Sequence, residues 1–119
     1  MKEYVDGYLL AVPSDQLDTY RAMASRAGEI WKEYGALDYR ECVGESLEHN
    51  HGMRNFRHAA EAGDNETVVF SWIVFRDKAD RDRINAAVMT DPRLQDVCIE
   101  GVFDPKRMAW GGFDTLVQA

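Results

Sequence analysis

The chain has 119 residues, of which 45% are hydrophobic, and its 14 lysines and arginines are outnumbered by 21 aspartates and glutamates. The length and the apolar content predict a single folded domain over residues 1–119. The net charge of −7 argues against nucleic acid and anionic membrane surfaces as partners, because both are bound through an excess of lysine and arginine.

The N-terminal part of the chain predicts a strand followed by a long helix. Residues 4–12 alternate between two largely apolar faces, which is typical of a strand. Over residues 14–34 apolar side chains recur at steps of three and four, as on one face of a helix. Ser14 or Asp15 is expected to cap this helix, and Gly35 to end it in a left-handed conformation.

The middle of the chain predicts two strands separated by a polar loop segment. A second strand is expected over residues 37–43, and the polar composition of residues 44–55 indicates a loop. Residues 56–62 fit either a short helix or an irregular strand, and a turn is expected over 63–66. Residues 67–75 are β-branched or aromatic almost throughout and predict the strongest strand.

The C-terminal part predicts a second helix and a last strand. Asp77 can cap a helix over residues 78–90, and residues 93–97 can add one short helical turn. A last strand is expected over residues 106–117, with Gly111-Gly112 as a bulge or a flattened edge.

This order of elements predicts an α+β fold of the ferredoxin-like kind, an antiparallel sheet with two helices on one face. The two helices leave one sheet face bare, yet the strand over 67–75 carries apolar side chains on both faces. Apolar patches larger than roughly a few hundred Å² usually mark interaction surfaces. We therefore expect a homodimer through this face, a dimeric α+β barrel. The alternative is a monomer in which residues 44–62 fold over the sheet.

Several short strings along nearly the whole chain carry a family resemblance. They are Tyr4-Val5-Asp6-Gly7-Tyr8, Val12-Pro13, Glu41-Cys42 with Gly44, Glu66 to Ile73, Asp91-Pro92-Arg93, Phe103 to Met108 and Gly111-Gly112-Phe113. On these strings the chain resembles the YbaA-like family of small uncharacterised bacterial proteins. The resemblance implies a dimeric α+β barrel and no assigned reaction or catalytic residue. Val43 and the string His49-Asn50-His51 depart from the family pattern, which often has Trp after the Glu-Cys pair and a shorter acidic loop.

Asp6 stands out because it lies among apolar neighbours in the first strand. A buried carboxylate can act as an acid or a base when its surroundings shift its pKa. The structural alternative, which we favour, is a charge pair with a strand-borne cation such as Arg40 or Arg107, because arginine suits a two-pronged carboxylate contact.

Three histidines, His49, His51 and His58, are weak candidates for metal ligands. Imidazole binds zinc and related ions, but the spacing matches no standard zinc pattern. We therefore expect no metal and no other cofactor.

The function that the sequence favours is binding of a small apolar or aromatic molecule between the sheet and the helices. Asp6, Tyr8, Arg40 and Trp72 are the predicted ligand-binding residues, because a few polar groups among apolar walls are typical of such sites. One alternative is an enzyme of the cofactor-free oxygenase or dehydratase sort, by analogy of fold, with Asp6 or a loop histidine as the base. The other is a structural dimer without a ligand.

The expected location is the cytoplasm. No apolar run approaches the about 20 residues that span a bilayer, and the N-terminus lacks a signal-peptide pattern. Cys42 and Cys98 lack the C-x-x-C spacing of zinc and redox sites and are expected to stay reduced.

Overall fold

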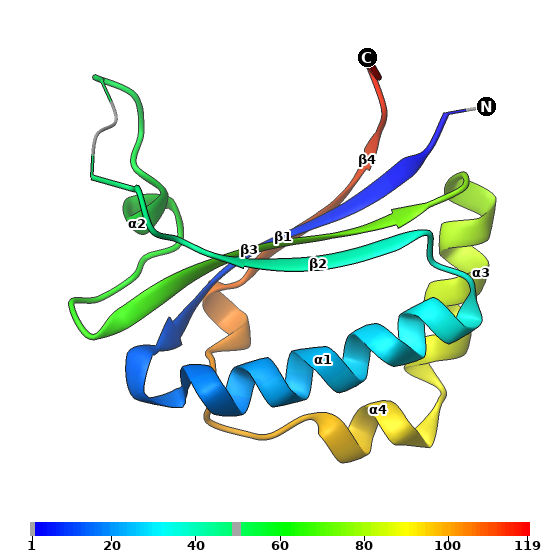
Figure 1. Ribbon diagram of the computed structural model, residues 1–119, viewed down its shortest axis with the longest axis horizontal. Coiled ribbons are helices and arrows are strands. Elements are labelled where there is room, and N and C mark those ends of the chain that lie inside the picture. Colours follow the sequence, from blue (N-terminus) through cyan, green and yellow to red (C-terminus); the bar gives the residue numbers. More distant parts are fainter. Residues whose placement is uncertain (1, 49–50) are drawn as a thin grey trace.

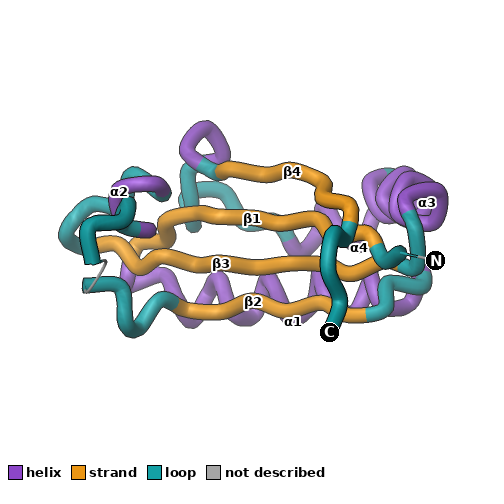
Figure 2. Tube along the Cα trace, turned by 90° about the horizontal axis from the view of Figure 1, so that it is seen from above, coloured by secondary structure: helices purple, strands orange, loops and turns teal. Residues whose placement is uncertain are grey.

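The sheet has four antiparallel strands in the order β2-β3-β1-β4, as Figures 1 and 2 show. The structure is a computed structural model that describes residues 2–48 and 51–119. Its elements are, in chain order, β1 (Tyr4–Pro13), η1 (Ser14–Gln16), α1 (Leu17–Tyr34), β2 (Asp38–Val43), α2 (Phe56–Ala59), β3 (Glu66–Phe75), α3 (Lys78–Met89), α4 (Pro92–Val97), η2 (Pro105–Arg107) and β4 (Ala109–Asp114). The predicted ferredoxin-like α+β fold is confirmed.

The helices α1, α3 and α4 lie on one side of the sheet, and the middle of the other face is uncovered (Figures 1 and 2). The core is built on the helix side, from the inward residues of the central strands and of the two long helices: Leu10, Val12, Val69, Ile73, Phe75, Ile30, Trp31, Ile84 and Val88. No helix within residues 2–48 and 51–119 has the length and apolar character needed to cross a membrane.

The ends of the helices follow the capping chemistry of the chain in most places. Gly35 has φ +117° and its N–H donates to Lys32 O at 3.1 Å, as expected for a left-handed end of α1. Asp77 caps α3, because its Oδ1 accepts from the N–H of Asp80 at 2.8 Å. The predicted cap of α1 is wrong: the helix begins after the 3₁₀ turn η1, and the Ser14 hydroxyl bonds that of Thr67 instead.

Around α2 and β4 the structure settles or alters the boundaries predicted from the sequence. Residues 56–59 form the short helix α2, which Asn55 caps by accepting from Arg57 N–H at 2.7 Å. The last strand is shorter than predicted, because residues 105–107 form the 3₁₀ turn η2 before it. Gly111 and Gly112 pair in unbroken register with β1, so they form no bulge. At Gly112 a Cβ atom would lie 2.5 Å from the hydroxyl of Tyr4, which crosses over this position.

An ion pair ties η2 to the start of β3. The two terminal nitrogens of Arg107 donate to Glu66 Oε1 and Oε2 at 2.8 and 2.6 Å. The Gly63 N–H adds a third bond to Glu66 Oε1, at 2.7 Å. The hydrogen bonds from Arg107, with that from Gly63, lower the pKa of Glu66 from 4.5 to about 2.

Replacing Glu66 by glutamine is therefore expected to lower the free energy of unfolding at neutral pH by about 2 kcal/mol, because charge-assisted hydrogen bonds are lost. The folded-state pKa is depressed, so as the pH falls the unfolded chain takes up the proton first. The stabilisation is complete above a pH of about 4.5 and is lost as the pH falls toward about 2.

Urea unfolding of the unmodified chain and of Glu66→Gln, repeated across the acid range, measures this difference. Glu33→Gln is the control, because the pair of Glu33 with Arg93 is much more exposed and solvent screening leaves it little effect on stability. A difference for Glu66→Gln that does not shrink with falling pH would contradict the assignment.

Candidate functional site

A row of polar side chains crosses the helix-facing side of the sheet. Glu41 is opposite Ser71, Ser71 is opposite Tyr8, and Tyr8 is opposite Trp110 in the strand register. Cross-strand partners project from the same face of a sheet, so these four side chains share the face on which α1 packs. The row places a carboxylate and two hydroxyls beneath a helix, where mostly apolar groups are expected.

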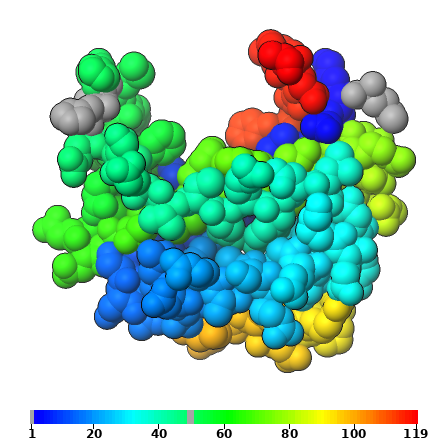
Figure 3. All heavy atoms as spheres, viewed as in Figure 1, coloured from blue at the N-terminus to red at the C-terminus, as the bar shows by residue number. Residues whose placement is uncertain are grey.

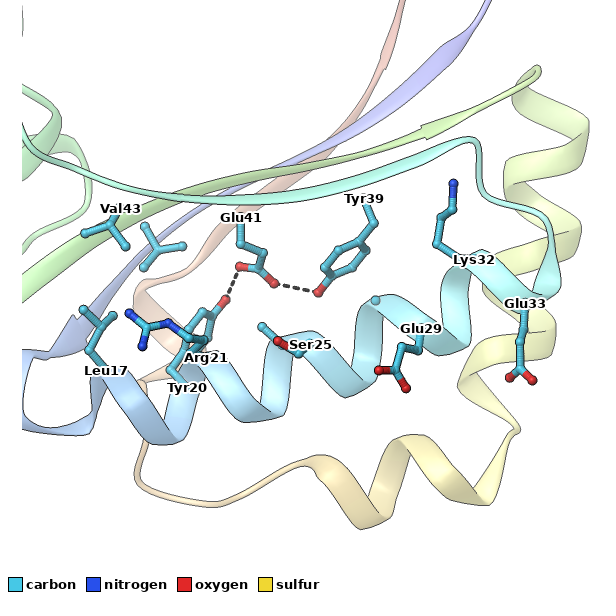
Figure 4. A pocket seen from close by; sticks show the side chains of 13 residues that line it. Leu17, Tyr20, Arg21, Ser25, Glu29, Lys32, Glu33, Tyr39, Glu41 and Val43 are labelled. Carbon is cyan, nitrogen blue, oxygen red and sulfur yellow. Dashed lines mark hydrogen bonds between the residues drawn. The ribbon is translucent and has the colours of Figure 1, made fainter.

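Glu41 is held by two tyrosines (Figure 4). The Tyr20 hydroxyl, from α1, donates to Glu41 Oε1 at 2.5 Å, and the Tyr39 hydroxyl, from β2, donates to Oε2 at 2.6 Å. Gly28 of α1 makes room for the Tyr39 ring, since a Cβ at position 28 would lie 2.7 Å from a ring carbon. The side chains of Tyr20, Tyr39 and Glu41, which we call the tyrosine clamp, thus link α1 to the edge strand.

The tyrosines of this region are neutral donors over the ordinary pH range. Burial raises the pKa of Tyr20 and of Tyr39 well above the usual value, and the nearby Glu41 carboxylate raises both further. Burial, and then the charge of Asp6, also raise the pKa of Tyr8. All three hydroxyls therefore keep their protons and can donate hydrogen bonds.

Two pockets meet at the tyrosine clamp. An outer groove of about 760 Å³ runs between α1 and β2, and Figure 4 shows the side chains that line it. An inner pocket of about 680 Å³ lies between the sheet, α1 and the segment that leads from α4 to β4, and its walls include Tyr8, Trp31, Ile73, Leu94, Phe103 and Met108. Tyr20, Tyr39 and Glu41 line both.

Asp6 is fully buried, and its partner is Arg81 of α3. Arg81 Nε donates to Asp6 Oδ1 and Oδ2 at 3.0 and 3.2 Å, and Asn85 Nδ2 donates to Oδ2 at 2.9 Å. The Arg81 guanidinium lies over the rings of Tyr4 and Trp110, 5.2 and 5.6 Å from their centroids. The expectation of a strand-borne partner is thus corrected.

The two arginines that were expected to pair with Asp6, Arg40 and Arg107, have other partners. Arg107 is bound to Glu66, and Arg40 lies on the opposite face of the sheet, near Asp38. Arg81 reaches Asp6 because α3 packs against the end of the sheet where β1 begins.

The four predicted ligand-binding residues do not share one site. Asp6 and Tyr8 lie on the helix side of β1, whereas the Arg40 guanidinium lies 5.9 Å from the Trp72 ring centroid on the open face. Tyr8 and Trp72 both line the inner pocket, but Asp6 and Arg40 line neither of the two pockets.

The two histidines within the described residues do not gather into a site. His49 lies outside the described residues, and His51 and His58 are exposed. Within residues 2–48 and 51–119, no group of three or more His, Cys, Asp or Glu side chains is placed to hold a metal ion. Cys42 and Cys98 are both free thiols.

Comparison with known proteins identifies the family. Residues 3–105 match the family model described as "Protein of unknown function (DUF1428)". The chain is 43% identical over 115 residues to the uncharacterized protein YbaA of Escherichia coli strain K12, covering 97% of both chains, and equally so to YbaA of Shigella flexneri. The chain therefore belongs to the DUF1428 family, and the resemblance to YbaA is confirmed.

Solved structures share the fold at low sequence identity. A dimeric ferredoxin-like protein from an uncultured marine organism aligns with a TM-score of 0.59 at 8% identity, covering 100% of both chains. A nipsnap family protein of unknown function from Agrobacterium tumefaciens gives 0.57 at 15%, covering 95% of this chain and 87% of its own. SnoaB, a cofactor-independent oxygenase from Streptomyces nogalater, gives 0.55 at 12%, covering 99% and 97%. These likenesses show the fold alone.

Proposed function

We propose that this member of the DUF1428 family is a homodimer that binds a small apolar or aromatic molecule in the inner pocket. The observation that carries the proposal is the pocket itself. Its volume of about 680 Å³ suits a small organic molecule, and its walls are largely aromatic and aliphatic. The polar groups of Tyr8, Ser71 and the tyrosine clamp converge on it from the sheet and from α1. We also propose that the protein is located in the cytoplasm.

A catalytic use of the pocket has weaker support. SnoaB has the same fold and is a cofactor-independent oxygenase, but the predicted bases are poorly placed here. Asp6 is enclosed by Arg81 and Asn85, and neither His51 nor His58 lines the inner pocket. Binding without turnover is therefore the function we favour, and a structural dimer without a ligand leaves the pocket unexplained.

The open sheet face supports the homodimer. Phe70 and Phe113 project from it with 45% and 61% of their surfaces exposed. Figure 3 shows this face hollowed between two projections, one formed by the described residues around α2 and one by the C-terminal residues and the start of β1. The α2 segment covers only one end, where Phe56 meets Phe70 with ring centroids 6.1 Å apart. Two structures of the same fold are described as dimeric ferredoxin-like proteins, which also favours a second copy on this face.

Blocking the inner pocket is expected to abolish binding of a neutral aromatic probe. Ala27 of α1 lines the pocket, so Ala27→Phe fills space that the probe needs. We expect 2-(2-naphthyl)ethanol to bind the unmodified chain saturably in isothermal titration calorimetry, and to bind Ala27→Phe at least about tenfold more weakly.

Ala22→Phe is the matched control, because Ala22 lies on the same helix but is exposed and lines neither pocket. Circular dichroism must first establish that both variants are folded. Absence of saturable binding to the unmodified chain, or equal affinity of the two variants, would overturn the ligand-binding proposal.

A further inference from the structure

The inner pocket has an unusual balance of charge. Its lining within the described part of the chain includes two carboxylates, Glu41 and Glu100, and no lysine, arginine or histidine. The cations of the neighbouring outer groove are engaged elsewhere: Arg21 pairs with Asp18 at 2.9 Å, and Lys32 Nζ donates to Leu37 O at 2.8 Å. A ligand in the inner pocket therefore meets negative charge.

The tyrosine clamp leaves the charge of Glu41 uncompensated. Its two hydrogen bonds come from neutral hydroxyls, and no ion pair joins Glu41 to a side chain of residues 2–48 or 51–119. A carboxylate offers about four acceptor positions, so two remain after Tyr20 and Tyr39 have donated. A charge that is partly withdrawn from water gains most from a partner of opposite sign.

The walls of the pocket favour the same sign of ligand charge. The aromatic side chains of Tyr8, Tyr20, Trp31, Tyr39 and Phe103 all line it. The face of an aromatic ring attracts a cation that lies within about 6 Å of its centroid. The tyrosines also stay uncharged, since burial holds the pKa of each above its usual value. An anionic ligand would instead face two carboxylates with no balancing cation.

We propose that the molecule held in the inner pocket is an organic cation, a protonated amine on an aromatic or branched apolar body, with its positive group bound at Glu41. This inference rests on the proposed function of the pocket and adds the charge of the ligand. The tyrosine clamp fixes both oxygens of Glu41 and so orients the remaining acceptor positions for the amine.

Three probes with the same ring system separate charge from shape. They are 2-(2-naphthyl)ethylamine, which is a cation at neutral pH, the neutral 2-(2-naphthyl)ethanol, and the anion 2-naphthylacetate. We expect the amine to bind the unmodified chain at least about tenfold more tightly than the alcohol, and the acetate to bind more weakly than both.

Glu41→Gln removes the charge and keeps the size of the side chain. In this variant the amine should lose its advantage, so that its affinity lies within about twofold of the affinity of the alcohol for the same variant. Glu29→Gln is the matched control, because Glu29 lines only the outer groove, and it should keep the preference.

The outcomes distinguish the two levels of the proposal. If none of the three probes binds, the ligand-binding function itself fails. If all three bind equally, the pocket stands and the cation inference is overturned. A preference for the amine that survives Glu41→Gln also overturns the assignment to Glu41. The comparison of probes on the unmodified chain needs no variant, so it decides the sign of the ligand charge even if Glu41→Gln does not fold.

Discussion

Replacing Asp6 by alanine is expected to lower the free energy of unfolding by about 3–5 kcal/mol, because it leaves the charge of Arg81 without its buried partner. Asp6 is 0% exposed and the Arg81 side chain only 15%, so water cannot readily replace the lost carboxylate. The Asn85 amide loses its acceptor as well. Trp31 donates to the other end of that amide, at 2.9 Å, so the disturbance extends to the floor of the inner pocket.

A double-mutant cycle separates the pair from its surroundings. Arg81→Met removes the charge and keeps much of the volume, so the double variant should be more stable than the sum of the two single changes predicts. Urea unfolding at a fixed protein concentration measures each variant, because association would otherwise shift the apparent stability. Asp38→Ala is the control, since the pair with Arg40 is exposed, has a separation of 3.8 Å and is worth less than about 1 kcal/mol. A cost for Asp6→Ala no larger than that of Asp38→Ala would contradict the prediction.

The fold could be predicted because its main signals are local. Alternation along residues 4–12 and 67–75 and the helical period over 14–34 mark elements that the structure contains, and Gly35 ends the helix as expected. Near η2 the capping preference of Asp104 outweighs the strand preference of the residues that follow it. Asp104 accepts from the Lys106 N–H at 3.0 Å and starts a 3₁₀ turn, which delays the last strand.

The partner of Asp6 could not be predicted, because it depends on how a helix packs. Arg81 lies 75 residues away in sequence, on α3, and the chain offers 14 lysines and arginines. Only the packing of α3 at the end of the sheet selects one of them. A cation on a neighbouring strand was expected, because side chains directly opposite each other on adjacent strands always lie close together.

The predicted ligand site mixed two faces of the sheet for a related reason. Alternation places Asp6 with Tyr8, and separately Arg40 away from Glu41, but it does not relate the inner face of one strand to that of another. Which faces of two strands lie on the same side of a sheet is usually inferred from their polarity. Here β1 and β3 are apolar on both faces, so polarity gives no answer. Hence Arg40 was grouped with Asp6 and Tyr8, which lie on the other face of the sheet.

The sequence contains only weak evidence for the tyrosine clamp. Tyr39 and Glu41 share a strand face, and Tyr20 belongs to the apolar stripe of the first helix. A glutamate on the face that also carries Val43 is a hint of an inward charge. Its meaning emerges only when α1 lies against β2 and both hydroxyls reach the same carboxylate.

Replacing Phe70 by glutamate is expected to make the protein monomeric, with the dissociation constant of the proposed dimer raised by at least about a hundredfold. Phe70 lies on the open face of β3, beside the α2 segment, and its ring centroid lies 6.1 Å from that of Phe56 and 5.6 Å from that of Trp72. In a face-to-face dimer the two-fold axis would bring two such charges into one apolar interface.

Size-exclusion chromatography with light scattering checks this result. The unmodified chain should have twice the protomer mass of 13.6 kDa, and Phe70→Glu should have the protomer mass. Leu37→Glu is the matched control, since Leu37 is 47% exposed, close to the 45% of Phe70, and lies in the bend that precedes β2. A monomeric unmodified chain, or a Phe70→Glu variant that remains dimeric, would refute the interface.

The same variant tests whether the two parts of the proposed function are independent. The inner pocket lies on the helix side of the sheet and is lined by residues of one chain, whereas Phe70 projects from the opposite face. A monomeric Phe70→Glu protein should therefore bind 2-(2-naphthyl)ethanol with an affinity within about threefold of that of the dimer. Loss of binding on dissociation, in a variant that remains folded, would instead show that the second copy shapes the pocket through the sheet.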